Sequence, residues 1–137
     1  IRENGTPLDF TFADFSVIIV NEKVAFLLNE EECQLIPVEI EGLKNKHTYF
    51  IVVLLNSVDC VDENRSNFEK YEADDPIRPD KAGHYKSIYE LHVNKNNING
   101  NSIFRIDKYG VDIIINEDLK NKFEKLGVTG VKFKDVT

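Results

Sequence analysis

The feature that most constrains the fold of this chain is a local pattern that occurs twice. The first copy reads IIVNEKV at residues 18–24, and the second reads IIINEDL at residues 113–119. Each copy places three apolar residues typical of a strand before an asparagine and an acidic residue. An asparagine side chain accepts hydrogen bonds from free amides at a helix start, and acidic side chains are favoured at that positive end. The pattern therefore predicts a strand-to-helix junction near each end of the chain.

The first junction extends to a strand–helix–strand unit. A strand over 16–20 precedes the predicted cap Asn21, and apolar residues at helical spacing follow it. The run LIPVEIE at 35–41 reads as the second strand. Pro37 has no amide to donate, so this strand is expected at a sheet edge or at a strand start.

The second junction predicts a similar unit. VDIIIN at 111–116 gives the strand and the cap, and EDLKNKFEKL gives a helix that Gly127 closes. GVKFKDV at 130–136 reads as a last strand. Because many strand-to-helix turns make the same physical demands, the repeat is interpreted as structural rather than as a duplicated binding site.

The middle of the chain predicts further strands. The near-continuous apolar run from Tyr49 to Leu55 indicates a central strand covered on both faces. Residues 62–83 are polar and contain DDP and RPD, which predicts a long loop or a loosely ordered segment. Two strands are expected at 87–93 and 102–107, joined as a hairpin by the turn-forming pair Asn99-Gly100.

This order of elements predicts an α+β fold, with a mainly antiparallel sheet, two helices packed on it, and strand–helix–strand units at the two ends. The chain has 137 residues and is 42% hydrophobic, which is enough for one core. We therefore expect a single domain over residues 1–137. Because the chain begins at Ile1, we expect that a natural N-terminal segment is missing.

Composition and charge restrict the classes of partner. The longest apolar runs are far shorter than the roughly 20 residues that span a bilayer, and no signal peptide is present, so a cytoplasmic protein without a membrane partner is expected. Cys33 and Cys60 are expected to be free, buried thiols. The net charge is −7 and the lysines are scattered, which disfavours nucleic acid and favours a basic protein partner.

Motifs for catalysis and metal binding are not found in the sequence. His47, His84 and His92 are far apart and form no ligand pattern, and the chain has no GxSxG, P-loop or GxGxxG motif. No catalytic residue, metal or cofactor is therefore predicted. Asp59, Asp62 and Glu63 could form a carboxylate cluster suited to acid–base chemistry or a hard cation, but the spacing is not that of an EF-hand.

Asp62 is interpreted instead as a turn residue that acts together with Ser66 where a strand ends.

Two acidic surfaces are candidates for binding. Glu30, Glu31 and Glu32 follow the first predicted helix, and at the negative end of a helix each exposed acid costs about 0.3–1 kcal/mol. Such a run is either a solvated helix end or a contact for a basic partner. The second surface has acids interleaved with aromatic residues, as is common in protein interfaces, and includes Phe68, Glu69, Tyr71, Glu72, Asp74 and Asp75.

Four stretches in order carry a resemblance to a known family: DFSVIIVNEKVAFLLNEEE, YFIVVLLNSVDCVDENRS, NSIFRI and VDIIINEDLKNKFEKLGVTGVKFKDV. The chain resembles the Imm11-type family of bacterial immunity proteins, which are found beside polymorphic toxin genes. The resemblance implies a protein that is not an enzyme and that binds and neutralises a cognate toxin. Members carry extra residues before the region that starts here. The family supplies no residue-level binding motif.

The expected partner is therefore a cognate toxin domain, with a basic, nuclease-like surface that an acidic protein would attract. The residues predicted to bind it are Glu30, Glu31, Glu32, Asp62, Glu63, Phe68, Tyr71, Asp74 and Asp75. One alternative is a small enzyme or ligand-binding domain that uses the region of Asp59 and Asp62. A further alternative is a scaffold or regulatory module with a different partner.

Overall fold

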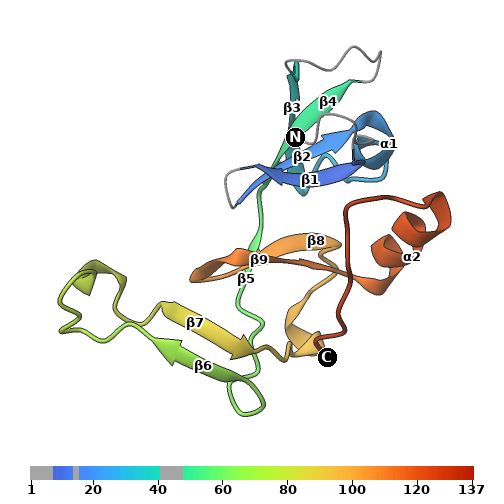
Figure 1. The fold of residues 1–137 in the computed structure, drawn as a ribbon. Helices are drawn as coiled ribbons and strands as arrows, with labels where there is room; N and C mark the ends of the chain where they lie inside the picture. Colours follow the sequence, from blue (N-terminus) through green and yellow to red (C-terminus); the bar gives the residue numbers. More distant parts are fainter. Residues whose placement is uncertain (1–7, 14–15, 41–47) are drawn as a thin grey trace.

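The computed structural model describes residues 8–13, 16–40 and 48–137. A four-stranded antiparallel sheet has the order β1-β2-β4-β3, from β1 (Phe10–Ala13), β2 (Val17–Asn21), β4 (Tyr49–Leu54) and β3 (Cys33–Val38). A three-stranded sheet has the order β5-β8-β9, from β5 (Ser57–Val58), β8 (Ile103–Ile106) and β9 (Tyr109–Ile115). The third sheet is an antiparallel pair, β6 (Asn67–Lys70) and β7 (Tyr85–Glu90). Figure 1 shows the three sheets one below the other.

Two α-helices complete the described fold, α1 (Glu22–Ala25) and α2 (Glu117–Leu126), together with the short 3-10 helices η1 (Pro79–Lys81) and η2 (Lys95–Asn97). The predicted α+β class with mainly antiparallel pairing is confirmed. The strands divide among three sheets instead of one, and β5 pairs with β8 in parallel.

Both strand-to-helix junctions form as the repeat predicts. The side chain of Asn21 accepts a hydrogen bond from the amide of Val24 at 3.2 Å, and that of Asn116 accepts one from the amide of Leu119 at 2.8 Å. Val24 and Leu119 are both buried, so each junction places its first helical apolar residue in the core. Gly127 ends α2 with φ +65°, as predicted, and its amide bonds to the carbonyl of the helix's last turn.

The central strand is β4, which pairs with β2 on one side and β3 on the other. Its side chains alternate between the two faces of the sheet. Val52 is buried, whereas Val53 on the opposite face is 39% exposed, so the expectation of cover on both faces is only partly correct. Pro37 lies in β3 at the edge of this sheet, as predicted. Residue 41, the end of that predicted strand, lies outside the described residues.

Two expectations about the strands are wrong, and one strand was not predicted. The strands β7 and β8 do not form a hairpin with each other, because β7 pairs with β6 and β8 pairs with β5 and β9. Asn99 and Gly100 do have the positive φ angles of the predicted turn, +54° and +75°. The polar segment 62–83 does contain the predicted long loop, but Asn67–Lys70 within it form β6, which the sequence did not predict.

The second wrong expectation is the last strand, because residues 130–136 are not a strand. In the C-terminal segment, here residues 129–137, the carbonyl of Thr129 accepts a hydrogen bond from the amide of Phe10, and the carbonyl of Val136 accepts one from the amide of Val93. Its hydrogen bonds thus go to two separate parts of the chain, so it does not form a ladder with one strand. Figure 1 shows the segment running from the end of α2 past the edge of the β8–β9 sheet.

Among the described residues, the core forms two clusters, one on each side of the β5-β8-β9 sheet. In β8, Ile103 packs in a first cluster with the four-stranded sheet and both helices, while Phe104 packs in a second cluster with residues near β7. In β9, Ile113 and Ile115 contact the first cluster and Ile114 belongs to the second. Side chains of a strand point alternately to opposite faces, so this sheet is apolar on both sides and joins the two halves of the core.

Candidate functional site

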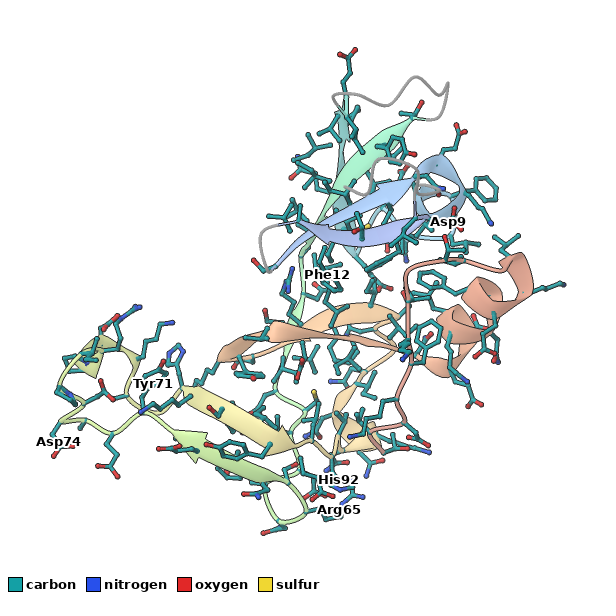
Figure 2. The ribbon with its side chains drawn as sticks, in the orientation of Figure 1. Asp9, Phe12, Arg65, Tyr71, Asp74 and His92 are labelled. Carbon is teal, nitrogen blue, oxygen red and sulfur yellow. The ribbon has the colours of Figure 1, made fainter. Side chains whose placement is uncertain are left out.

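The most prominent surface feature is a projecting hairpin, here called the arm, which comprises residues 67–90. It contains β6, the loop 71–84 and β7. Figure 1 shows the arm extending away from the β8–β9 sheet, with its loop at the far end. In Figure 2, Tyr71 and Asp74 lie toward the far end, whereas Arg65 and His92 lie at the base. The predicted binding residues from Asp62 to Asp75 therefore all lie along the arm or at its base.

At the base of the arm, Asp62 organises a turn. Its carboxylate accepts hydrogen bonds from the Arg65 Nε at 2.8 Å and the Asn64 amide at 3.1 Å, and its carbonyl accepts one from the Ser66 amide at 2.9 Å. The bond from Arg65 is the main reason that the pKa of the Asp62 carboxyl lies below its usual value. The predicted role of Asp62 as a turn residue with Ser66 is confirmed.

Glu63 holds the inner face of the arm against the body. Its Oε1 accepts hydrogen bonds from the Tyr85 hydroxyl at 2.8 Å and is 2.6 Å from the Lys70 Nζ. The ammonium group of Lys70 lies over the rings of Phe68 and Tyr85, which pack edge to face with centroids 5.4 Å apart. Burial of the Tyr85 hydroxyl, together with its bond to Glu63, raises its pKa well above the ordinary value. Phe68 is partly buried and packs against the second cluster.

The tip of the arm leaves other predicted residues on the surface. Tyr71 is half-buried, and the ammonium groups of Lys81 and Lys86 lie 6.0 and 5.8 Å from its ring centroid. Asp74 is exposed. Asp75 is partly buried, and its Oδ1 accepts hydrogen bonds from the Ile77 amide at 2.9 Å and from the Arg78 amide at 2.7 Å.

The acidic run after α1 lies away from the arm, so the structure does not bring the two predicted acidic surfaces together. The helix ends at Ala25, and the backbone then follows a separate turn in which Asn29 accepts hydrogen bonds from the Glu31 and Cys33 amides. The expected unfavourable position of Glu30, Glu31 and Glu32 at a helix C-terminus is therefore wrong. Glu30 and Glu31 are exposed, whereas Glu32 is partly buried.

Glu32 joins two distant parts of the chain. Its Oε2 accepts hydrogen bonds from the Ser102 hydroxyl at 2.7 Å, the Ser102 amide at 2.9 Å and the Ile103 amide at 3.1 Å. Burial alone raises the pKa of this carboxyl, but the bonds from Ser102 and Ile103 outweigh it, and the pKa lies below its ordinary value. Glu32 thus connects the turn after α1 to the start of β8.

Two exposed side chains on the arm were missed by sequence reasoning. Tyr89 in β7 is 65% exposed, and its hydroxyl donates to Glu69 Oε2 at 3.1 Å. Ile77 at the tip is 82% exposed. The alternation in β7 could have placed Tyr89 on the face opposite the partly buried Ile88, and the prolines on either side of Ile77 could have indicated a shaped loop.

The described residues do not form the carboxylate site of the enzyme alternative. A hollow of about 430 Å³ is lined by Asn56, Ser57, Val58, Asp59, Asn97, Asn99 and Asn101. Asp59 lines this hollow, but Asp62 does not and is engaged by Arg65. Within residues 8–13, 16–40 and 48–137, no three potential metal ligands come together.

The two cysteines and His92 are the remaining candidate reactive groups, and each is packed or paired within the fold. Cys33 and Cys60 are buried free thiols, as predicted, and burial and nearby Asp59 raise the pKa of Cys60 to about 11. The partly buried His92 lies 3.2 Å from Glu90, and His47 lies outside the described residues. In the part of the chain that the structure describes, no helix is both long and apolar enough to cross a membrane.

Comparison with known protein families agrees with the resemblance seen in the sequence. The model of the immunity protein family Imm11 matches residues 2–137. A comparison with curated proteins gives no match. The match extends over the four-stranded sheet, the arm and the C-terminal segment, so it covers every element described above.

Proposed function

The chain belongs to the Imm11 immunity protein family, and on that premise we propose that it binds a cognate bacterial toxin and neutralises it by forming a stoichiometric complex. In this proposal the protein is not an enzyme and acts in the cytoplasm of the cell that it protects. The single observation that carries the proposal is the family match over nearly the whole chain. The toxin belongs to a polymorphic toxin system and is encoded beside the gene for this protein.

The arm is proposed as the main toxin-binding surface. The arm projects from the body (Figure 1), and Tyr89, Glu69 and Asp74 on it are exposed to solvent. Tyrosine side chains bury a large area at a small cost in conformational entropy and are enriched in protein interfaces. The hydrogen bond between the Tyr89 hydroxyl and Glu69 fixes the ring before binding, which reduces that cost further.

Charge supports a basic toxin surface as the complement. The chain carries a net charge of −7, and a field of that sign raises the rate at which a basic partner finds it. Among the predicted residues, Glu30, Glu31 and Asp74 are exposed and remain candidates for direct contact. Glu63 is exposed as well, but its carboxylate is bonded to Lys70 and Tyr85. Glu32, Asp62, Glu63, Phe68 and Asp75 contribute by holding the shape of the surface, and Tyr71 combines both roles.

The proposal is tested by co-expressing the protein with the toxin domain encoded by the neighbouring gene and by titrating the purified pair at low and high salt. Survival of the cells and one-to-one binding that weakens as salt rises are expected, because surface charge attraction is screened. Protection at amounts of protein far below the amount of toxin would instead indicate catalysis. A folded protein that neither binds nor protects would refute the proposed function.

A further inference from the structure

The tip of the arm presents one apolar side chain in a polar setting. Ile77 is 82% exposed, while its neighbours Asp74, Arg78 and Asp80 are charged and also largely in solvent. A single exposed apolar residue on a protein surface is common and needs no explanation by itself. Ile77 differs because the surrounding loop fixes its position through several independent contacts.

The loop is closed at its neck by backbone hydrogen bonds. The Tyr71 amide donates to the His84 carbonyl at 2.9 Å, and the Gly83 amide donates to the Tyr71 carbonyl at 3.0 Å. Gly83 has φ +83°, a conformation that residues with a side chain rarely adopt. The neck thus continues the pairing of β6 with β7 and holds the two ends of the loop together.

The backbone of Ile77 itself is held by Asp75. The Asp75 Oδ1 accepts the Ile77 amide at 2.9 Å and the Arg78 amide at 2.7 Å. Pro76 and Pro79 stand on either side of this pair, and proline restricts the backbone of the free chain. An isoleucine side chain is branched at Cβ and has few rotamers to lose. Ile77 is therefore presented in a defined position before any partner arrives.

Some of the charged side chains around Ile77 are engaged by other groups of the arm, and others are exposed to solvent. The guanidinium of Arg78 makes two bonds to Asp80, at 3.1 and 2.9 Å, and Lys81 and Lys86 lie against the Tyr71 ring. The cations at the tip are thus engaged within the loop, while the acids Glu72 and Asp74 are exposed. A partner that accepts the tip therefore meets an apolar side chain flanked by negative charge.

We propose that Ile77 is an anchor that enters an apolar pocket on the toxin, and that basic side chains of the toxin border this pocket. This inference rests on the proposed function and specifies the partner's surface. A preorganised apolar knob surrounded by charge matches the usual plan of an interface hot spot, in which a buried centre is enclosed by a polar rim. Asp75 is a positioning residue, because it acts through the backbone of Ile77.

The test measures the affinity of purified variants for the toxin domain encoded by the neighbouring gene. Ile77→Ala removes three carbon atoms from the interface, which is expected to weaken binding about 10- to 100-fold. Phe26→Ala is the matched control, because Phe26 is 89% exposed and stands at the C-terminal end of α1, a helix that lies away from the arm (Figure 1). This control is expected to keep the wild-type affinity. Asp74→Asn is expected to reduce the salt dependence of binding.

Amide hydrogen exchange separates an anchor from a merely structural role. In Ile77→Ala the Arg78 amide is expected to exchange as slowly as in the wild type, because Asp75 still holds it. In Asp75→Ala the amides of residues 77 and 78 are expected to exchange faster, with a smaller loss of affinity than in Ile77→Ala. Unchanged affinity of Ile77→Ala, while the wild-type protein binds, overturns the anchor but leaves the proposed function intact. Failure of the wild type to bind and protect overturns both.

Discussion

Replacement of Glu32 tests how the turn after α1 is joined to the start of β8. One carboxylate oxygen accepts three hydrogen bonds, from the hydroxyl and amide of Ser102 and from the amide of Ile103. A hydrogen bond to a charged group contributes about 1.5–3 kcal/mol, but three bonds that share one partly exposed oxygen do not add fully. Glu32→Ala is therefore expected to lower the free energy of unfolding by about 2–4 kcal/mol.

Glu32→Gln keeps an oxygen acceptor but removes the charge. Hydrogen bonds to an ionised acceptor are roughly twice as strong as neutral ones, so this variant is expected to lose about 1–2 kcal/mol. The matched control is Glu31→Gln, because Glu31 is exposed and lies next to Glu32 in the same turn. Its free energy of unfolding is expected to stay within about 0.5 kcal/mol of the wild type.

The assay is urea unfolding of the wild type and the three variants between neutral and acidic pH. The pKa of Glu32 is lower in the folded protein than its ordinary value of 4.5. Its contribution is therefore fully present above the unfolded pKa and is lost as the pH falls through the folded pKa. The difference between the wild type and Glu32→Gln should be largest near pH 7 and should shrink as the carboxyl becomes protonated. Equal stabilities at pH 7, or a difference that does not depend on pH, would refute the link through Glu32.

Three further predictions concern the rest of the fold. Asn116→Ala removes the N-cap of α2 and is expected to lower the free energy of unfolding in urea by about 1 kcal/mol. Asn116→Ser can still cap the helix and should keep most of this stability, so equal losses in the two variants would contradict the capping role. Phe104→Ala empties a fully buried site in the second cluster and should cost about 3–5 kcal/mol, so a loss below about 1 kcal/mol would argue against that packing. Because β8 and β9 contribute to both clusters, far-ultraviolet circular dichroism and tyrosine fluorescence should report one shared unfolding transition, and two separated transitions would contradict a single domain.

Interactions between residues close in the sequence were enough to predict several features of the fold. The caps Asn21 and Asn116, the closing Gly127, the edge position of Pro37 and the Asp62 turn each depend on residues within a few positions, and the structure confirms them. The apolar run of β4 likewise indicated a central strand, and β4 does pair with both β2 and β3, although one of its faces is only partly covered.

The elements that were missed depend on distant partners. The β6–β7 pair has two register shifts, so β6 lacks a regular alternation that a period of two could reveal. The C-terminal segment has the composition of a strand, but its hydrogen bonds go to Phe10 and Val93, on separate parts of the body. Ser102 is 70 residues from Glu32, so nothing near Glu32 in the sequence indicates its bonds.

The difference between side chains bonded to distant parts of the chain and side chains that face solvent also decides how the toxin-binding surface should be mapped. Adjacent acids look alike in a sequence, but Glu32 carries three hydrogen bonds while Glu30 and Glu31 face solvent. An alanine at Glu32 or Glu63 is expected to weaken toxin binding through loss of structure, because each carboxylate holds two parts of the chain together. Loss of affinity at such a position therefore does not identify a contact. Substitutions at exposed positions such as Glu31, Asp74 and Ile77 leave the fold intact, so only their effects on affinity can locate the interface.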